Sequence, residues 1–297
     1  MLNTLPALLL TILWGTSFAV SSTPILMFEN EILPIRFFSV SLVPMIFTVT
    51  FVTLAGLLSQ FSQKGIIRGK FPREALHPVY LQRRIYGMMW TQVYYFKPLY
   101  AVVLAIPFFK TYVLRLFGYR GDTDFVLYPD TWIRDLPILK VGSGAYLSNK
   151  STIGTNICLT DGSVLVDRVI LEQKSLVGHL AMVAPGVKLG PSAEVGVGCA
   201  IGIRVRMAEG AKVNPSCTLN HGSIIGSHSE IGTYANVGLR TEVGPGLKVP
   251  SGTVLPPGMV FQTQQDVDRI VESQRLDLFN QKESLAQILQ RTLEHVS

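Results

Sequence analysis

Residues 177–202 read VGHLAMVAPGVKLGPSAEVGVGCAIG, and the spacing of their aliphatic side chains decides the fold. Every sixth residue from Val141 to Leu255 is aliphatic or Met, without an insertion or deletion in the period. Gly follows many of these positions, and the residue two before is mostly small. A helix needs apolar spacing near 3.6 and an amphipathic strand a spacing of 2, so neither alone explains a period of six.

A period of six predicts very short strands that are joined by tight turns and stacked as a solenoid. Three hexads close a triangular coil of about eighteen residues, and parallel strands of successive coils lie about 4.8 Å apart. Gly fits where backbone angles or close contacts exclude a side chain. We expect roughly six to seven coils. Small residues should stack in one column, in which Cys199 and Cys217 are packing residues. The column consists of Ala145, Ser163, Ala181, Cys199, Cys217, Ala235 and Thr253.

The composition excludes several classes of protein. A net charge of +6 with only 15% charged residues and a mean hydropathy of +0.34 favour contact with lipid. The three cysteines form no CxxC pair, so a disulfide framework or a zinc ribbon is not expected. The basic residues gather beside apolar runs, which indicates attraction to anionic lipid heads rather than to nucleic acid.

Two uncharged runs, residues 1–28 and 37–58, are each long enough to cross a bilayer, which takes about 20 helical residues. A second span follows the first run at once, so a signal peptide is disfavoured. Glu29 and Glu31 lie between the runs, and a basic group follows the second: Lys64, Arg68, Lys70, Arg73, Arg83 and Arg84. By the positive-inside rule, we expect a transmembrane hairpin in the cytoplasmic (inner) membrane, with all downstream residues on the cytoplasmic side.

A third apolar run, residues 99–109, is too short to span and is broken by Pro107. It predicts an in-plane or re-entrant helix pair at the level of the lipid headgroups. An amphipathic helical pattern follows the repeats and would cover the open end of the solenoid or pack between subunits. The chain is thus divided into a membrane hairpin (1–58), interfacial helices (59–120), the solenoid (121–262) and a C-terminal helix (263–297).

The repeats in residues 177–202 and in LNHGSIIGSHSEIGTYANVG (219–238) resemble those of the hexapeptide-repeat acyltransferase family. This resemblance implies an all-β solenoid of the left-handed parallel β-helix type. The order of membrane helices, then FGYRGDTDFVLYPDTWIRDLP (117–137), then coils is similar to the C-terminal membrane regions of polylysine-synthetase-like peptide synthetases. Those regions carry a His near the position of Asn156.

The family resemblance implies a homotrimer with sites in the grooves between neighbouring solenoids. The co-substrate would be an acyl-CoA such as acetyl-CoA, or a carrier-protein thioester, with no tightly bound cofactor. One His would act as general base on a hydroxyl or amine acceptor, and backbone N–H groups can hold the oxyanion. The acceptor would be a small molecule, a peptide or a lipid-linked group.

Histidines in the coils are the candidates for this base. His179 and His221 each follow a core aliphatic by two residues, and His228 follows one by three. An Asn or Asp precedes the catalytic His in the family stretch, so Asn220 and His221 are expected at the site. His228 would contribute across a subunit groove, and His179 is the reserve candidate. The expected column neighbours of His221 are Ile203 and Leu239.

Arg204, Arg240 and Lys248 are the expected contacts for the phosphates of the donor. No metal site is expected, because the spacing of the three coil histidines does not match the zinc ligands of a γ-class carbonic anhydrase. Two alternatives stay open: an amide-forming domain of a peptide-synthetase system, and a catalytically idle membrane scaffold. The coils are expected to lack an extruded loop, which slightly favours the scaffold. Binding of a donor in the groove between subunits would distinguish an enzyme from a scaffold.

Overall fold

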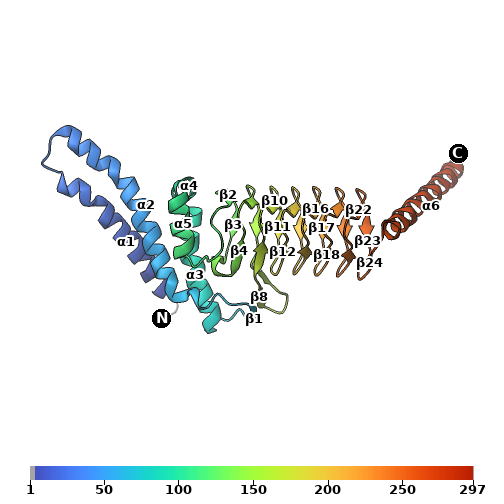
Figure 1. Cartoon of the computed structure of the whole chain (residues 1–297), viewed down its shortest axis with the longest axis horizontal. Helices are drawn as coiled ribbons and strands as arrows, with labels where there is room; N and C mark the ends of the chain where they lie inside the picture. Colours follow the sequence, from blue (N-terminus) through green and yellow to red (C-terminus); the bar gives the residue numbers. More distant parts are fainter. Residues whose placement is uncertain (1–3, 297) are drawn as a thin grey trace.

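The computed structural model of the chain describes residues 4–296, of which 278, 280 and 286–296 are described by their backbone alone. A bundle of helices is followed by a long solenoid and a final helix (Figure 1). The helices are α1 (Thr4–Met27), α2 (Leu33–Gln63), α3 (Pro78–Tyr95), α4 (Lys97–Ala105), α5 (Pro107–Leu116) and α6 (Gln264–Val296). A short 3-10 helix, Leu136–Ile138, precedes the third strand of the first coil.

Three parallel sheets of seven strands each form the solenoid, so it has seven coils. The first sheet contains β2 (Val126–Leu127), β5 (Tyr146–Leu147), β10 (Leu176–Val177), β13 (Glu194–Val195), β16 (Lys212–Val213), β19 (Glu230–Ile231) and β22 (Lys248–Val249). The second contains β3 (Trp132–Ile133), β6 (Thr152–Ile153), β11 (Met182–Val183), β14 (Ala200–Ile201), β17 (Thr218–Leu219), β20 (Asn236–Val237) and β23 (Val254–Leu255). The third contains β4 (Leu139–Val141), β9 (Val169–Leu171), β12 (Lys188–Leu189), β15 (Arg206–Met207), β18 (Ile224–Ile225), β21 (Glu242–Val243) and β24 (Val260–Phe261).

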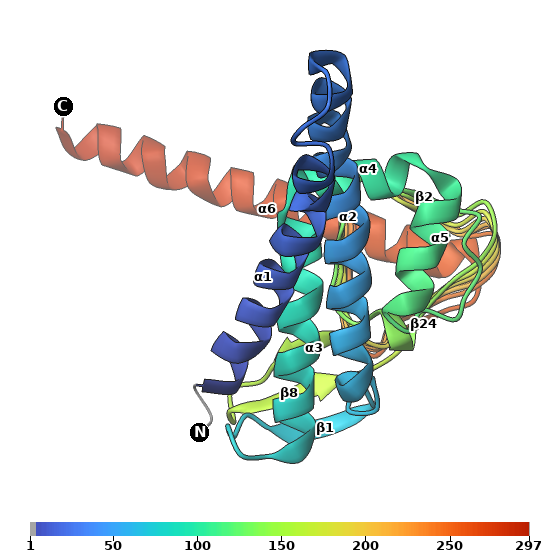
Figure 2. The same cartoon turned by 90° about the vertical axis from the view of Figure 1, so that its left-hand side faces the viewer.

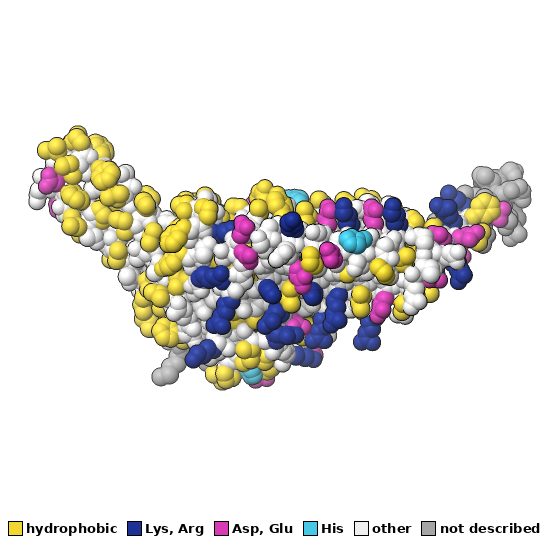
Figure 3. Space-filling model, in the orientation of Figure 1, with side chains coloured by type: hydrophobic (Ala, Val, Ile, Leu, Met, Phe, Trp, Pro, Cys, Tyr) yellow, Lys and Arg dark blue, Asp and Glu magenta, His cyan; other side chains and the backbone are white. Residues whose placement is uncertain are grey.

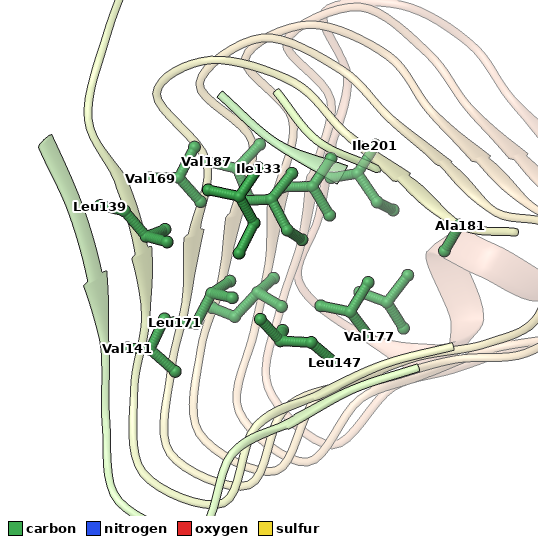
Figure 4. Close-up of a cluster of buried hydrophobic side chains, with 14 of the residues drawn as sticks. Ile133, Leu139, Val141, Leu147, Val169, Leu171, Val177, Ala181, Val187 and Ile201 are labelled. Atoms are coloured by element: carbon green, nitrogen blue, oxygen red, sulfur yellow. The ribbon is translucent and has the colours of Figure 1, made fainter. Parts of the chain in front are cut away.

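The expected stacking of residues eighteen apart is confirmed from β10 onward, where Val177 pairs with Val195. Within the coils, the aliphatic residue of each hexad points into a narrow core (Figure 4). The Gly that follows it is required by close approach between coils: a Cβ on Gly226 would lie 2.4 Å from the carbonyl carbon of Gly244. Cys199 and Cys217 are buried in the small-residue column, as expected.

The expectation that residues eighteen apart stack throughout the solenoid is wrong. Ile153 pairs with Val183, thirty residues away instead of eighteen, because a β-hairpin leaves the solenoid between β6 and β9. Its strands are β7 (Asn156–Cys158) and β8 (Ser163–Val166), and β8 also pairs with β1 (Gly69–Pro72), which enters from the helical part. The insertion adds twelve residues, or two hexads, so it preserves the sequence period while it leaves the core.

The hairpin also corrects the expected column of small residues. Tyr146 pairs with Leu176, so Ala145 lies beside Ser175 rather than beside Ser163. Ser163 is in β8, outside the coils. The coils therefore carry an extruded loop after all, and the argument that its absence favours a scaffold no longer applies.

Helices α1 and α2 are antiparallel, and each is long and apolar enough to cross a membrane. Helices α4 and α5 are together apolar enough to span and are bent by 115° at Ile106, which is the geometry of a broken span or a re-entrant loop. The C-terminal third of α2 is packed against α3 and α5, which lie beside it (Figure 2). Thr53 of α2, for example, shares a hydrogen bond of 3.0 Å with Tyr112 of α5.

Buried polar contacts join this helical part to the base of the solenoid. Arg83 of α3 donates to Asp135 at 2.7 Å, and both side chains are at most 5% exposed. The indole of Trp90 donates to the carbonyl oxygen of Ile133 at 2.6 Å. These contacts, together with the β1–β8 pairing, fix the first coil against the helices.

At the other end, Val267 of α6 is fully buried, and Ile270 and Val271 are partly buried against the last coil. The first turns of α6 therefore cover the open end, and the rest of the helix projects away from it (Figure 1). The amphipathic pattern expected after the repeats also includes Leu278, Ile288 and Leu289, which lie outside the described side chains.

Candidate functional site

His221 lies in the turn between the second and third sheets, which we call the second corner (residues 184–187, 202–205, 220–223 and 238–241). Its Nδ1 accepts a hydrogen bond of 2.9 Å from the backbone N–H of Ile203, one coil earlier. A Cβ on Gly202 would lie 2.7 Å from the same Nδ1, so a Gly at that position leaves room for the ring. The expected column of Ile203, His221 and Leu239 is therefore present.

This contact defines the protonation of neutral His221. Because Nδ1 accepts a hydrogen bond, the ring proton lies on Nε2. The lone pair available to remove a proton is then on Nδ1, and it faces the Ile203 amide. His221 can act as a base only when an acceptor group takes the place of that amide hydrogen.

A groove of about 270 Å³ runs from His221 across the outer face of the second sheet. Its floor is mostly apolar and is formed by β11, β14 and β17, with Met182 and Ile201 among the lining residues. Asn156 and Ile157 of the extruded hairpin line it together with Gly154. We call this feature the His221 groove; the hairpin that interrupts the repeat forms part of its wall.

On the other side of the second corner is a cavity of about 520 Å³, which we call the basic cavity. Its lining includes five cationic side chains and one carboxylate: Arg68, Arg168, Lys188, Arg204, Arg206 and Asp167. The cations exceed the carboxylates by four, which makes this cavity a suitable site for phosphate groups. Figure 3 shows Lys and Arg side chains gathered where the helices meet the solenoid.

Asp167 organises this cavity. Its side chain is only 6% exposed, and Arg68 and Arg204 contact its two oxygens at 2.7 and 3.1 Å. Burial alone would raise the pKa of Asp167, but the hydrogen bonds from the Arg168 amide, Arg68 and Arg204 outweigh it and lower that pKa. The ionised carboxylate thus holds two arginines in place, Arg68 just before β1 and Arg204 on the second corner.

The two features meet at one edge of the solenoid. Arg204 lines the basic cavity, and the residue before it, Ile203, holds His221. Gly202 and His221 line the groove. An anion in the cavity would therefore lie around the corner from the imidazole, on the same coils.

The other predicted residues are not all gathered here. The turn between the first and second sheets holds His179, and that between the third and first holds His228, so one chain has its three coil histidines at three different corners. Asn220 donates to Asn236 at 2.8 Å and to the carbonyl of Val237, and supports the turn rather than the ring.

Two of the three predicted cations lie on the second corner. Arg240 lies two coils from Arg204 in the same column, with Gly222 between them, as expected. Lys248 is on the outer face of the first sheet, where it pairs in register with Glu230. The structure therefore separates Lys248 from the corner that carries His221 and Arg204.

Sequence reasoning missed Arg68, Asp167 and the contribution of Asn156. Arg68 is in the segment that joins the helices to the solenoid, and only the β1–β8 pairing brings it to the coils. A signal for the hairpin was present, since Asp161-Gly162 lies between alternating apolar residues, and Asp-Gly is a strong hairpin turn.

No protein-family model and no curated relative matches this chain. Several solved structures resemble the solenoid at low identity. A perosamine N-acetyltransferase from Caulobacter crescentus, solved with CoA and GDP-perosamine, is 18% identical with a TM-score of 0.29, over 54% of this chain and 64% of that one. A UDP-N-acetylglucosamine acyltransferase from Campylobacter jejuni is 14% identical with a TM-score of 0.34, over 51% and 77%.

The acetyltransferase domain of PglB from Neisseria gonorrhoeae is 23% identical, with a TM-score of 0.18, and the match covers 43% of this chain and 53% of that one. The chain thus spans less than two thirds of the length of the Caulobacter and Neisseria proteins. At these identities and TM-scores, the likenesses carry no conclusion about the function of this chain.

Proposed function

We propose that this chain is a membrane-anchored acyltransferase that moves an acyl group from an acyl-CoA, or a carrier-protein thioester, to a hydroxyl or amine acceptor. The observation that carries the proposal is the placement of the His221 groove and the basic cavity on either side of one corner. A thioester donor needs both features: cations for its phosphates and a base beside its reactive carbonyl. Arg204 binds the phosphates, and His221 is the general base.

The repeat resembles that of left-handed β-helices that work as homotrimers, and we extend both properties to this chain. Helices α1 and α2 would anchor it in the cytoplasmic membrane with the solenoid on the cytoplasmic side, because cations such as Lys64 and Lys70 follow α2. In a trimer, the open His221 groove would be closed by the neighbouring solenoid. His228, at another corner, is the residue that a neighbour could add to it.

The chemistry uses the pair formed by His221 and Ile203. An acceptor hydroxyl or amine displaces the Ile203 amide and gives its proton to Nδ1 as its oxygen or nitrogen bonds to the thioester carbon. The released Ile203 N–H is then free to donate to the oxyanion, about 3 Å away. When the intermediate collapses, the C–S bond breaks and the thiolate takes the proton from the imidazolium, which leaves the acylated acceptor, a free thiol and neutral His221.

Thermal unfolding of the detergent-purified protein with a panel of acyl-CoAs tests this proposal. A ligand that binds only the folded state at one hundred times its Kd adds about 2.7 kcal/mol to the free energy of unfolding, so the cognate donor raises Tm. The best donor is then used to search for acceptors, with His221→Ala as the inactive control. If no acyl-CoA and no acyl carrier protein raises Tm, the donor site is refuted and a scaffold is favoured.

A further inference from the structure

A second apolar groove, of about 590 Å³, lies between α2 and the bent α4–α5 pair. Its lining is almost entirely apolar and includes Pro44, Met45, Val49, Val102, Ile106 and Phe108. Several of these side chains are open to the surroundings, with Phe108 81% and Met45 68% exposed. We call this feature the apolar groove.

The position of the apolar groove along α2 places it within the bilayer. Helix α2 has 31 residues, which makes it about 46 Å long, whereas the hydrocarbon core is about 30 Å thick. The segment before residue 50 is largely uncovered by protein, and the segment after it is packed against α3 and α5. The uncovered segment, which includes Met45 and Val49, is therefore the spanning part.

A cavity of about 520 Å³ lies at the other end of α2, where the chain leaves the membrane. Its lining includes Lys64, Arg120, Lys140 and Arg168 and no acidic residue. The side chains of these four cations are exposed, and no ion pair joins any of them to a carboxylate in the described part of the chain. We call it the interfacial cavity.

The apolar groove and the interfacial cavity lie on one face of α2. Met45 lines the first and Gln63 the second, and the eighteen residues between them make about five full turns at 3.6 residues per turn. Helix α5 runs beside this face, where Gln63 donates to the carbonyl oxygen of Leu116 at 2.8 Å. The α2–α5 seam thus leads from an apolar site in the bilayer to a cationic site at its surface.

The interfacial cavity is next to the basic cavity, because Arg168 lines both. Cations therefore extend from the end of α2 to Arg204, beside His221. A molecule that fits both the apolar groove and the interfacial cavity has a long apolar chain and a phosphate head.

We propose that the α2–α5 seam binds a lipid phosphate, with the apolar chain in the apolar groove and the phosphate among Lys64, Arg120 and Lys140. Such a lipid would present its head group to the His221 groove as the acceptor. The role as acceptor rests on the proposed acyl transfer, but the binding of the lipid does not. Ordinary anionic phospholipids share the phosphate chemistry, and the experiment separates them from the proposed ligand.

Equilibrium binding of a radiolabelled polyprenyl monophosphate to the full-length protein in detergent tests the site. We expect saturable binding that the corresponding polyprenol and inorganic phosphate do not displace, because each lacks one half of the ligand. Phosphatidylglycerol should compete at least tenfold more weakly. Equal competition by the polyprenol or by phosphatidylglycerol would overturn the proposal.

Variants locate the binding. Lys64→Gln combined with Arg120→Gln should weaken it roughly tenfold or more, since charge-assisted contacts are lost, whereas Lys212→Gln on the first sheet should not change it. Val49→Trp fills the apolar groove and should weaken binding similarly. Val40→Trp is its control, because Val40 is exposed and lies about two and a half turns away, on the opposite face of α2.

Val102→Trp fills the same groove from α4 and replaces Val49→Trp if that variant fails to fold. Unchanged binding in the folded groove and cavity variants would contradict the assignment. Loss of lipid binding with acyl-CoA binding retained would leave the proposed acyl transfer in place, so the two proposals fail separately.

Discussion

The backbone N–H of Ile203 donates a hydrogen bond of 2.9 Å to Nδ1 of His221, one coil further along the chain. Stacking of the coils produces this contact, because a period of eighteen places the two residues in one column. It joins a potential base to a potential oxyanion donor. The resting contact also holds the ring in one orientation until an acceptor enters.

Replacement of His221 by Ala should lower acyl transfer by about 10²–10⁴-fold, the usual contribution of a general base. The ring is exposed, so Tm should remain within a degree or so of the wild-type value. The measurement is the rate of thiol release from the best acyl donor in the presence of acceptor. His179→Ala is the matched control, and full turnover in His221→Ala would discard the assignment of the base.

Ile225→Ala should lower the free energy of unfolding by about 2–5 kcal/mol, because its side chain is fully buried in the coils. Leu165→Ala, at a position that an unbroken period would also bury, should cost clearly less, because Leu165 lies in the hairpin and is only partly buried. Chemical denaturation of both variants measures the difference. Equal losses of unfolding free energy in the two variants would contradict the placement of Leu165 in a hairpin outside the coils.

Asp135→Ala should destabilise the junction between α3 and the first coil by about 3–5 kcal/mol, since it leaves the buried Arg83 without its partner. Asp135 also accepts a hydrogen bond of 2.7 Å from Thr155, which adds to the loss. The double change Arg83→Met with Asp135→Leu removes both charges and should recover most of the stability. Thermal unfolding of the single and double variants provides the test, and no recovery in the double variant would show that more than the ion pair is involved.

Acid should weaken the protein partly through Asp167. Its folded-state pKa is lowered, so its stabilising effect is complete above the unfolded-state value of about 3.9 and is lost as pH falls through the folded-state value. Asp167→Asn should therefore be less stable than the wild type at pH 7. The difference in free energy of unfolding between the two proteins should become smaller below about pH 4. Denaturation curves across that range measure it, and a constant gap would contradict the ionised state of this carboxylate.

The sequence period predicts the solenoid and the stacking from β10 onward, because each hexad repeats the same local packing. It does not reveal the hairpin, since two extra hexads keep the aliphatic spacing while Leu159 and Leu165 leave the core. The corner that carries His221 and Arg204 was predictable from the column alone. Arg68 and Asp167 were not, because their pairing depends on β1, which joins the solenoid from ninety-nine residues away in the chain.

The proposed acyl transfer requires that Arg204 and its neighbours bind the phosphates of a thioester donor. The most direct measurement is the Kd of the best acyl-CoA for the wild type, for Arg204→Gln combined with Arg206→Gln, and for Lys212→Gln as control. We expect the double variant of Arg204 and Arg206 to bind the acyl-CoA at least tenfold more weakly, which is roughly the loss of one charge-assisted contact. The Lys212→Gln control should leave Kd unchanged. Equal affinity in all three proteins would contradict the placement of the donor.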